Sequence, residues 1–282
     1  MDSFYPRFRS RLESLLQHGS IWEMSERAIR ALEDVVWKRQ GIRVIECFGD
    51  SHVAIFRRLD GIPGSIGFRF RCVSVDGATA SGILNPNSKT NANRVFNAWL
   101  NRLPRTTPVL FMLGEVDLGF VIWWRAEKYG ESHVKTAEQA VQNYTSFLAQ
   151  VRQSHPLLIV SSVPLPTIRD GEYSSQVANF RREITASQKE RTDLTLWFNR
   201  QLKAWCTCQS VAYLDLDPLT LDRKTGLIKS SLLNKKPWDH HYEPDTFCAL
   251  LACVLVEQGI LDSLSTNPRS IDGGKTALVE RI

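Results

Sequence analysis

The residue types that perform nucleophilic catalysis occur in this sequence at two widely separated places. Ser51 follows a glycine and an aspartate directly after the apolar run 42–48. Asp239 lies beside His240 and His241, close to the other end of the chain. A serine hydroxyl becomes a nucleophile when an imidazole accepts its proton and a carboxylate orients that imidazole. Because geometry and not chain order defines such a triad, these residues predict a serine hydrolase or acyl transferase.

These groups can meet only if the intervening elements form an open α/β sheet. Short apolar segments predict five strands, at 42–48, 68–75, 108–113, 157–163 and 211–216. Helical spacing of apolar residues predicts helices at 88–103, 132–153, 187–206 and 245–260, and a short helix is expected to begin at Ser51. Strands that alternate with long helices predict a three-layer α/β/α sandwich with a central, mostly parallel five-stranded sheet. Such sheets bind ligands at the carboxyl ends of their strands, which is where Ser51 is expected.

The remaining segments extend this α/β domain, which we expect over residues 41–262. Residues 1–40 predict a helical N-terminal extension, and residues 263–282 predict a C-terminal tail. The polar stretch 167–184 is expected to run over the sheet, and residues 217–242 lack clear periodicity.

Composition limits the classes of partner. The 282 residues are 43% hydrophobic and 23% charged, as in ordinary globular proteins, and the net charge of +5 is spread along the chain. We therefore expect no nucleic-acid partner. No apolar run is long enough to span a bilayer, and the first residues do not resemble a signal peptide. The six cysteines fall mostly in apolar segments, which is typical of reduced thiols and favours a cytoplasmic location. The sequence does not predict an oligomeric state.

Four short blocks, in this order, resemble those of the SGNH (GDSL-type) hydrolase superfamily. They are Gly49-Asp50-Ser51-His52, the turn from Gly77 to Gly82, Gly114-Glu115-Val116-Asp117, and Asp239-His240-His241. Together with Asn85-Pro86-Asn87-Ser88, the second and third blocks also resemble a bacterial branch associated with polysaccharide or surface-glycan genes. The resemblance covers about residues 42–260 and implies a flavodoxin-like fold.

The resemblance also implies a role for each block. Ser51 would be the nucleophile, one of the two histidines the base, and Asp239 the carboxylate that orients it. The second block would supply a glycine amide to the oxyanion hole, and either Gly77 or Gly82 could do so.

Two departures from the family pattern affect the expected activity. Val116 stands where the family has an asparagine that donates to the oxyanion, and a missing donor costs about 10² to 10³ in rate unless Asn85, Asn87 or a backbone amide replaces it. The last block has one residue between Asp239 and His241, where two are usual. Either His241 pairs with Asp239 through a tighter turn, or His240 is the base and another acid orients it.

Several of these residues have simpler interpretations. Ser51 could cap the helix that follows it. Glu115 and Asp117 could be an acid–base pair or metal ligands, but Asp117 is expected to hold its loop by accepting backbone hydrogen bonds. Trp123 could line an acyl or sugar pocket, or belong to the core of a short helix.

The expected function is a serine esterase or O-acyltransferase that acts on a small ester, such as an O-acylated sugar, through an acyl-enzyme at Ser51. No organic cofactor is expected, because neither a dinucleotide-binding nor a phosphate-binding glycine motif is present. No metal is expected either, because no second cysteine pair completes a zinc site with Cys206 and Cys208, and the first half of the chain has no Asp-x-Asp motif. One alternative is an SGNH-like module that binds a glycan or protein without turnover. Another is a metal-dependent phosphoesterase, with the ligands Asp50, His52, Asp117, Asp239 and His240.

Overall fold

The computed structural model describes residues 32–33, 35–37, 39–61, 67–171, 184–236 and 238–265. Most of the expected N-terminal extension lies outside the described residues, as do residues 172–183 of the expected excursion and all but the first three residues of the expected tail. The chain divides into two compact units, Met1–Arg43 and Val44–Ile282. Everything described below belongs to the second unit, apart from the first residue of β1.

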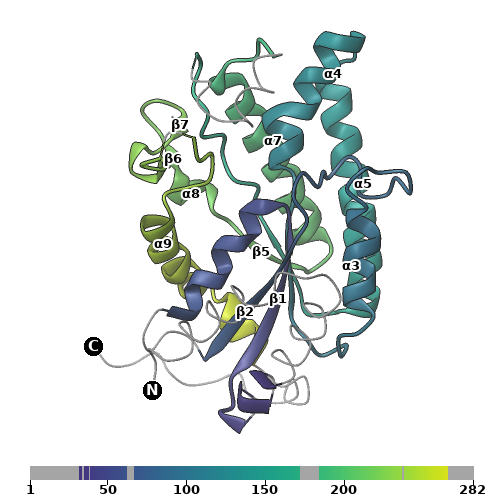
Figure 1. Ribbon diagram of the computed structural model, residues 1–282, viewed down its shortest axis with the longest axis vertical. Coiled ribbons are helices and arrows are strands. Elements are labelled where there is room, and N and C mark those ends of the chain that lie inside the picture. The colour runs from purple at the N-terminus through teal and green to yellow at the C-terminus, as the bar shows by residue number, and fades with distance from the viewer. Residues whose placement is uncertain are drawn as a thin grey trace, which may run out of the picture. The chain divides into compact units, whose positions relative to one another are not determined.

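The central sheet has the five parallel strands that the apolar segments predict, and the predicted fold class is confirmed. Its order is β2-β1-β3-β4-β5, the flavodoxin-like order (Figure 1). The strands are β1 (Arg43–Gly49), β2 (Phe68–Ser74), β3 (Val109–Met112), β4 (Leu158–Ser161) and β5 (Ala212–Leu214). In the register between β1 and β3, Gly49 pairs with Met112, so these two strands end at the same edge of the sheet.

Helices follow the strands, as the spacing of apolar residues predicts. They are the 3₁₀ helix η1 (Ser51–Gly61), α3 (Ala92–Leu100), the π-helical turn η2 (Asp117–Val121), α4 (Ile122–Tyr129), α5 (His133–Ser154), α7 (Gln188–Cys208), α8 (Asp217–Thr220), the 3₁₀ helix η4 (Ser230–Leu232), α9 (Pro244–Glu257) and α10 (Ile260–Ser265). Ser187 caps α7 in a capping box with Glu190, a local signal that fixes where this helix begins.

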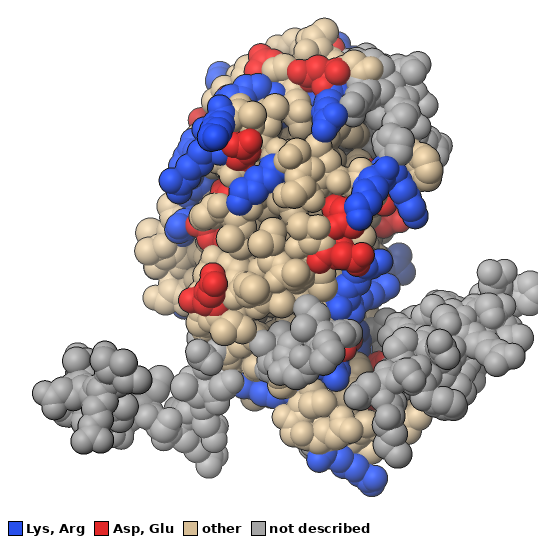
Figure 2. Space-filling view, turned by 90° about the vertical axis from the view of Figure 1, so that its left-hand side faces the viewer, with Lys and Arg blue, Asp and Glu red and all other residues tan. Residues whose placement is uncertain are grey.

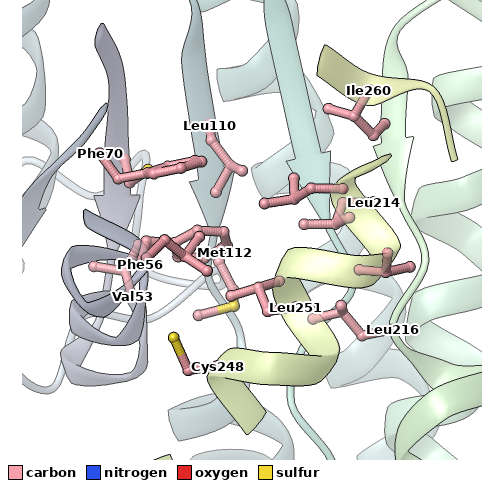
Figure 3. Close-up of a cluster of buried hydrophobic side chains, with 14 of the residues drawn as sticks. Val53, Phe56, Phe70, Leu110, Met112, Leu214, Leu216, Cys248, Leu251 and Ile260 are labelled. Atoms are coloured by element: carbon pink, nitrogen blue, oxygen red, sulfur yellow. The ribbon is translucent and has the colours of Figure 1, made fainter. Parts of the chain in front are cut away.

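Each face of the sheet buries its own apolar cluster, which makes three layers. On one face, η1 and α9 pack against the strands, and Figure 3 shows Val53 and Phe56 of η1 near Met112 and Leu251 of α9 close by. On the other face, the cluster is built from α3, η2, α4, α5 and α7. Since both faces are covered, the central strands are mostly apolar, and β3 and β4 are buried along their whole length.

One buried charge interrupts the apolar sheet. Glu46 of β1 is buried, and its carboxylate accepts hydrogen bonds from Arg71 of β2 at 2.8 Å and from the indole of Trp99 at 3.1 Å. A buried carboxylate is tolerated when it is paired in this way. The pair joins the edge strand β2 to its neighbour and to α3.

The stretch 217–242, for which no periodicity predicts an element, contains several short ones. After α8, the strands β6 (Leu221–Asp222) and β7 (Leu227–Ile228) form an antiparallel hairpin, and η4 follows. These elements are too short for a periodic pattern to show in the sequence. They carry the chain from the sheet to the loop that precedes α9.

The surface carries both charge signs. On the face shown in Figure 2, Lys and Arg side chains alternate with Asp and Glu among larger uncharged areas. In the part of the chain that the structure describes, no helix combines the length and hydropathy that a membrane span requires.

Candidate active site

Ser51 is the first residue of η1 and directly follows the turn that ends β1. Gly49, the last residue of β1, is packed so closely that an added Cβ would overlap the carbonyl oxygen of Met112 in β3. The glycine is therefore required by the close approach of two backbones. As a result, the serine is attached to the centre of the sheet through a backbone that has little room to move.

Ser51, His241 and Asp239 form a continuous hydrogen-bonded chain. Nε2 of His241 lies 2.9 Å from the hydroxyl oxygen of Ser51, and Nδ1 of the same ring lies 2.8 Å from Oδ1 of Asp239. The same carboxylate oxygen accepts the backbone amide of His241 at 3.0 Å. With Nδ1–H donating to the carboxylate, Nε2 carries the lone pair that can accept the serine proton.

A tight turn lets Asp239 reach His241 although only one residue separates them. Because the backbone and the ring of His241 both contact Oδ1 of Asp239, the two side chains meet without the usual extra residue. Of the two candidate histidines, the structure therefore brings His241 into contact with Ser51. His240 lies beside it, with the two ring centroids 4.3 Å apart.

Contacts on both sides of His241 hold the loop before α9 in place. Leu233 and Tyr242 form an antiparallel bridge, and the amide of Glu243 donates to the carbonyl of Leu232. The hydroxyl of Tyr242 accepts the amide of Leu165, which lies after β4, at 2.6 Å. Tyr242 is buried, so its neighbour His241 is fixed to the carboxyl end of the sheet.

Asp239 is held in its ionised form. Burial alone would raise the pKa of this carboxyl, but hydrogen bonds from the backbone and ring of His241, together with the nearby imidazole charges, lower it from its ordinary value. An ionised acceptor at this position fixes the tautomer of His241 and stabilises the imidazolium that forms when the ring takes up a proton.

A second carboxylate–imidazole pair lies next to the first. Oδ1 of the buried Asp50 accepts the backbone amide of His52 at 2.9 Å and contacts Nδ1 of its ring at 3.1 Å. The ring of His52 lies 4.5 Å from that of His241 and 5.3 Å from that of His240, measured between centroids. Asp50 thus holds its own turn, and His52 packs beneath the two loop histidines.

Asp117 organises the turn between Gly77 and Gly82. Its fully buried carboxylate accepts the amides of Ala80 at 2.6 Å and Ser81 at 3.2 Å. Burial raises the pKa of Asp117 to about 6, although these hydrogen bonds act in the opposite direction. These contacts agree with the expectation that Asp117 holds a loop by accepting backbone hydrogen bonds. Both of its carboxylate oxygens face backbone amides.

The two candidate glycines have different environments. Gly77 adopts a left-handed conformation, with φ of 72°, in the turn after β2. The amide of Gly82 donates to the hydroxyl of Thr79 at 3.1 Å. Asn143 of α5 donates to the carbonyl of Ser81 at 2.6 Å and supports this turn from outside. Both glycines therefore lie in one turn that Asp117 and α5 hold in place.

Four other residues proposed from the sequence are characterised by their burial and by their contacts with nearby residues. Asn85 is exposed and accepts the amide of Asn87 at 2.9 Å, which closes its own turn. Glu115 is buried directly after Gly114, and Val116 precedes the π-helical turn η2. Trp123 is buried, with its indole N–H bonded to the carbonyl of Leu118 at 2.8 Å and its ring stacked on His133. That arrangement favours the core interpretation of Trp123 over a pocket.

Sequence reasoning missed the residues that support the site from a distance. Asn143 and Tyr242 act through backbone groups of segments far away in the chain, and Thr167 does so by donating to the carbonyl of His240. No local motif marks such partners, because each contact exists only once the strands are in place.

Comparison with known proteins gives a likeness of fold. No family model and no curated protein matches the chain. Among solved structures, a proposed platelet activating factor from Streptococcus pneumonia matches with a TM-score of 0.50 and 14% identity, over 82% of this chain and 98% of that chain.

Two further structures carry the names of enzymes. A GDSL-like lipase from Bacteroides thetaiotaomicron matches with a TM-score of 0.45 and 14% identity, over 93% of this chain and all of that chain. An acetyl xylan esterase matches with a TM-score of 0.45 and 10% identity, over 76% and 98% of the two chains. At such identities the likeness concerns the fold alone: this chain has an α/β fold in which helices flank a five-stranded parallel sheet, and neither a family nor a branch of one is shown.

Proposed function

We infer that this protein is a serine esterase or O-acyltransferase that acts on a small ester through an acyl-enzyme at Ser51. The observation that carries this inference is the hydrogen-bonded chain from Ser51 through His241 to Asp239. A serine that only caps a helix has no need of an imidazole at its hydroxyl and a carboxylate behind that imidazole. The arrangement supplies the general base that a serine hydroxyl needs to become a nucleophile, and the carboxylate that orients this base.

Acylation follows from the contacts at Ser51. Nε2 of His241 takes the hydroxyl proton while the serine oxygen attacks the ester carbonyl, and the carbonyl π electrons move onto its oxygen. When the carbonyl re-forms, the ester C–O bond breaks and His241 returns the proton to the departing alcohol. Asp239 stabilises the imidazolium between these steps without taking the proton itself.

The oxyanion requires donors at the carboxyl end of the sheet. The amide of Ser51 lies at the start of η1, and the turn held by Asp117 contains both Gly77 and Gly82. Backbone amides in such a fixed turn lose little free energy to reorganisation during the reaction. These backbone amides would donate hydrogen bonds to the oxyanion in place of the asparagine side chain that the family pattern has at the position of Val116.

Deacylation determines whether the reaction is hydrolysis or transfer. His241 removes a proton from either water or an acceptor alcohol, whose oxygen attacks the acyl carbon. When the bond from that carbon to the Ser51 oxygen breaks, His241 returns the proton to the departing serine oxygen. Both outcomes use the same acyl-enzyme. The substrate class that we propose is a small O-acyl ester, with an O-acylated sugar as the first candidate, as expected from the sequence blocks.

Labelling with a fluorophosphonate probe tests the proposal directly. The probe phosphonylates an activated serine and needs no knowledge of the substrate. We expect stoichiometric labelling of the full chain, located at Ser51 by peptide mass spectrometry, and turnover of p-nitrophenyl acetate by the same preparation.

Two variants serve as controls. Ser51→Ala should abolish both labelling and turnover, and Ser74→Ala should retain both, since the Ser74 hydroxyl contacts the carbonyl of Asp50 at 3.1 Å and the carboxylate of Asp76 at 3.3 Å, neither of which takes part in the proposed reaction. A well-folded wild-type chain that resists labelling would contradict the proposal and favour a binding module instead.

A further inference from the structure

Three histidines meet at the carboxyl end of the sheet, although the proposed reaction uses only one of them. His52, His240 and His241 each offer a ring nitrogen, and these nitrogens all lie within 4.8 Å of one another. His52 comes from η1, whereas the other two come from the loop before α9. Within the described part of the chain, the cluster joins elements that are far apart in sequence.

Two of these imidazoles are arranged as metal-binding imidazoles are. Nδ1 of His52 contacts Asp50, and Nδ1 of His241 contacts Asp239. A metal-ligating histidine commonly donates its other N–H to a carboxylate, which fixes the tautomer and makes the ligating nitrogen more basic. In both residues this places the lone pair on Nε2.

Charge and exposure also suit a cation. The carboxylates of Asp50 and Asp239 lie directly behind the imidazoles, so the site supplies negative charge without placing it in the first coordination sphere. Side-chain exposure is 6% for His52 and 36% for His241, so the cluster has a buried base and an accessible edge. An ion could therefore enter from solvent and keep a water molecule as its fourth ligand.

We propose that His52, His240 and His241 form a site for a single Zn²⁺ ion that inhibits the serine centre. Three imidazoles and a water molecule make an ordinary tetrahedral zinc site, with Zn–N bonds of about 2.0–2.1 Å and ligand nitrogens about 3.3 Å apart. The nitrogens must approach one another by up to about 1.5 Å, which rotations of the half-buried rings of His240 and His241 can supply while the loop backbone stays in place.

The inhibitory part of this inference rests on the proposed function. A metal bound to Nε2 of His241 occupies the lone pair that must accept the proton of Ser51. Zinc and the serine hydroxyl therefore compete for the same nitrogen. Activity would fall as the site fills and return when a chelator removes the ion.

Zinc binding is measured by titration calorimetry on the full chain. Cys208 and Cys253 are exposed thiols that could bind zinc independently, so the experiment uses the background Cys208→Ser/Cys253→Ser. We expect one Zn²⁺ per chain. The affinity should be at least about 10-fold lower in His240→Ala and in His52→Asn, because each variant loses one of three ligands.

His133→Ala is the matched control, since it removes an exposed histidine of α5 that stacks on Trp123 outside the cluster. This variant should bind zinc as the background does. Circular dichroism establishes that each variant is folded. If His52→Asn does not fold, His240→Ala decides the result, because its side chain lies in a half-buried loop.

The same proteins separate zinc binding from catalysis. Saturating zinc should slow fluorophosphonate labelling of Ser51 at least about 10-fold, with recovery after chelation, and His240→Ala should require more zinc for the same effect. Absence of stoichiometric zinc binding, or equal affinity in His240→Ala and the background, would overturn the proposed site. Labelling that bound zinc leaves unchanged would overturn the inhibition. A zinc-free protein that cannot be labelled would contradict the proposed function, while calorimetry would still test the metal site.

Discussion

His241 and Ser51 are 190 positions apart in the chain, yet Nε2 of the histidine lies 2.9 Å from the hydroxyl oxygen of the serine. One residue follows β1 and the other precedes α9, so the sheet itself brings them together. A base and a nucleophile that are already in contact have little conformational entropy left to lose when the ester binds.

The two neighbouring histidines should differ sharply in their effect on catalysis. We expect His241→Ala to lower kcat by about 10⁴-fold or more, because the serine loses its base. His240→Ala should lower kcat by less than about 10-fold, since this ring packs beside His241, whose Nε2 is the nitrogen that lies 2.9 Å from the serine hydroxyl. Steady-state kinetics of p-nitrophenyl acetate hydrolysis distinguishes the two. Equal losses would contradict the assignment of His241 as the base.

Asp239→Asn should preserve the fold and remove most of the activity. The amide keeps the size of the side chain, but its N–H₂ group can favour the wrong tautomer of His241, and we expect kcat to fall by about 10⁴-fold with little change in KM. Asp76→Asn, an exposed acid in the turn after β2, is the control and should leave kcat unchanged. A variant of Asp239 with near wild-type kcat would show that another acid orients the base.

Stability should depend on pH through the buried Asp117. Its pKa of about 6 in the folded protein lies above the ordinary value of 3.8, because burial disfavours the ionised form. This group therefore stabilises the fold fully below about pH 4, and the contribution is lost as pH rises through 6. The difference corresponds to roughly 3 kcal/mol over that interval.

Urea unfolding of wild type and Asp117→Asn between pH 4 and pH 7.5 measures this dependence. The free energy of unfolding of the wild type, taken relative to the variant, should rise as the pH falls across this range. Asp76→Asn again serves as the control and should follow the wild type. If Asp117→Asn showed the same pH dependence as the wild type, the titration would belong to another group.

Gly49→Ala should disrupt the junction between β1 and η1. Its Cβ would overlap the carbonyl oxygen of Met112, a backbone atom that cannot move without separating β1 from β3, and we expect a loss of at least about 3 kcal/mol. Gly130→Ala is the comparison, because it has open space but a left-handed φ of 67°, and should cost only about 1 kcal/mol. Thermal unfolding of both variants tests the contrast, and similar losses would exclude the proposed steric cause.

Much of this fold is predictable because its signals are local. Strands buried on both faces are mostly apolar, and helices that cover them repeat their apolar residues at helical spacing, so both leave patterns in a short window. The π-helical turn η2 and the hairpin β6–β7 leave none, since five residues of a helix or two of a strand span little more than one structural repeat. Trp123 was equally consistent with core and pocket, because its environment depends on α5, which supplies the stacked His133.

In the candidate site, too, some features have a local sequence signal and others depend on contacts between distant segments. The block after β1 and the acid–histidine block before α9 are visible as local strings, and so is the expectation that Asp117 holds a loop. Which histidine contacts Ser51 was not predictable. That choice depends on the bridge between Leu233 and Tyr242 and on the bond from Leu165 to the Tyr242 hydroxyl. Contacts between distant segments decide it.

The segment from Asn234 to Trp238 enters just after the bridge residue Leu233 and leaves just before Asp239. Between these borders, the carbonyl of Lys236 accepts the amide of Asp239, so the acid of the triad is tied to this stretch through a main-chain bond that does not depend on a side chain. The side chains of Lys236 and Trp238 are exposed, so exchanging them would alter the surface beside the acid while that bond stays in place, which makes these two positions the first to vary when engineering a preference for one acceptor over another.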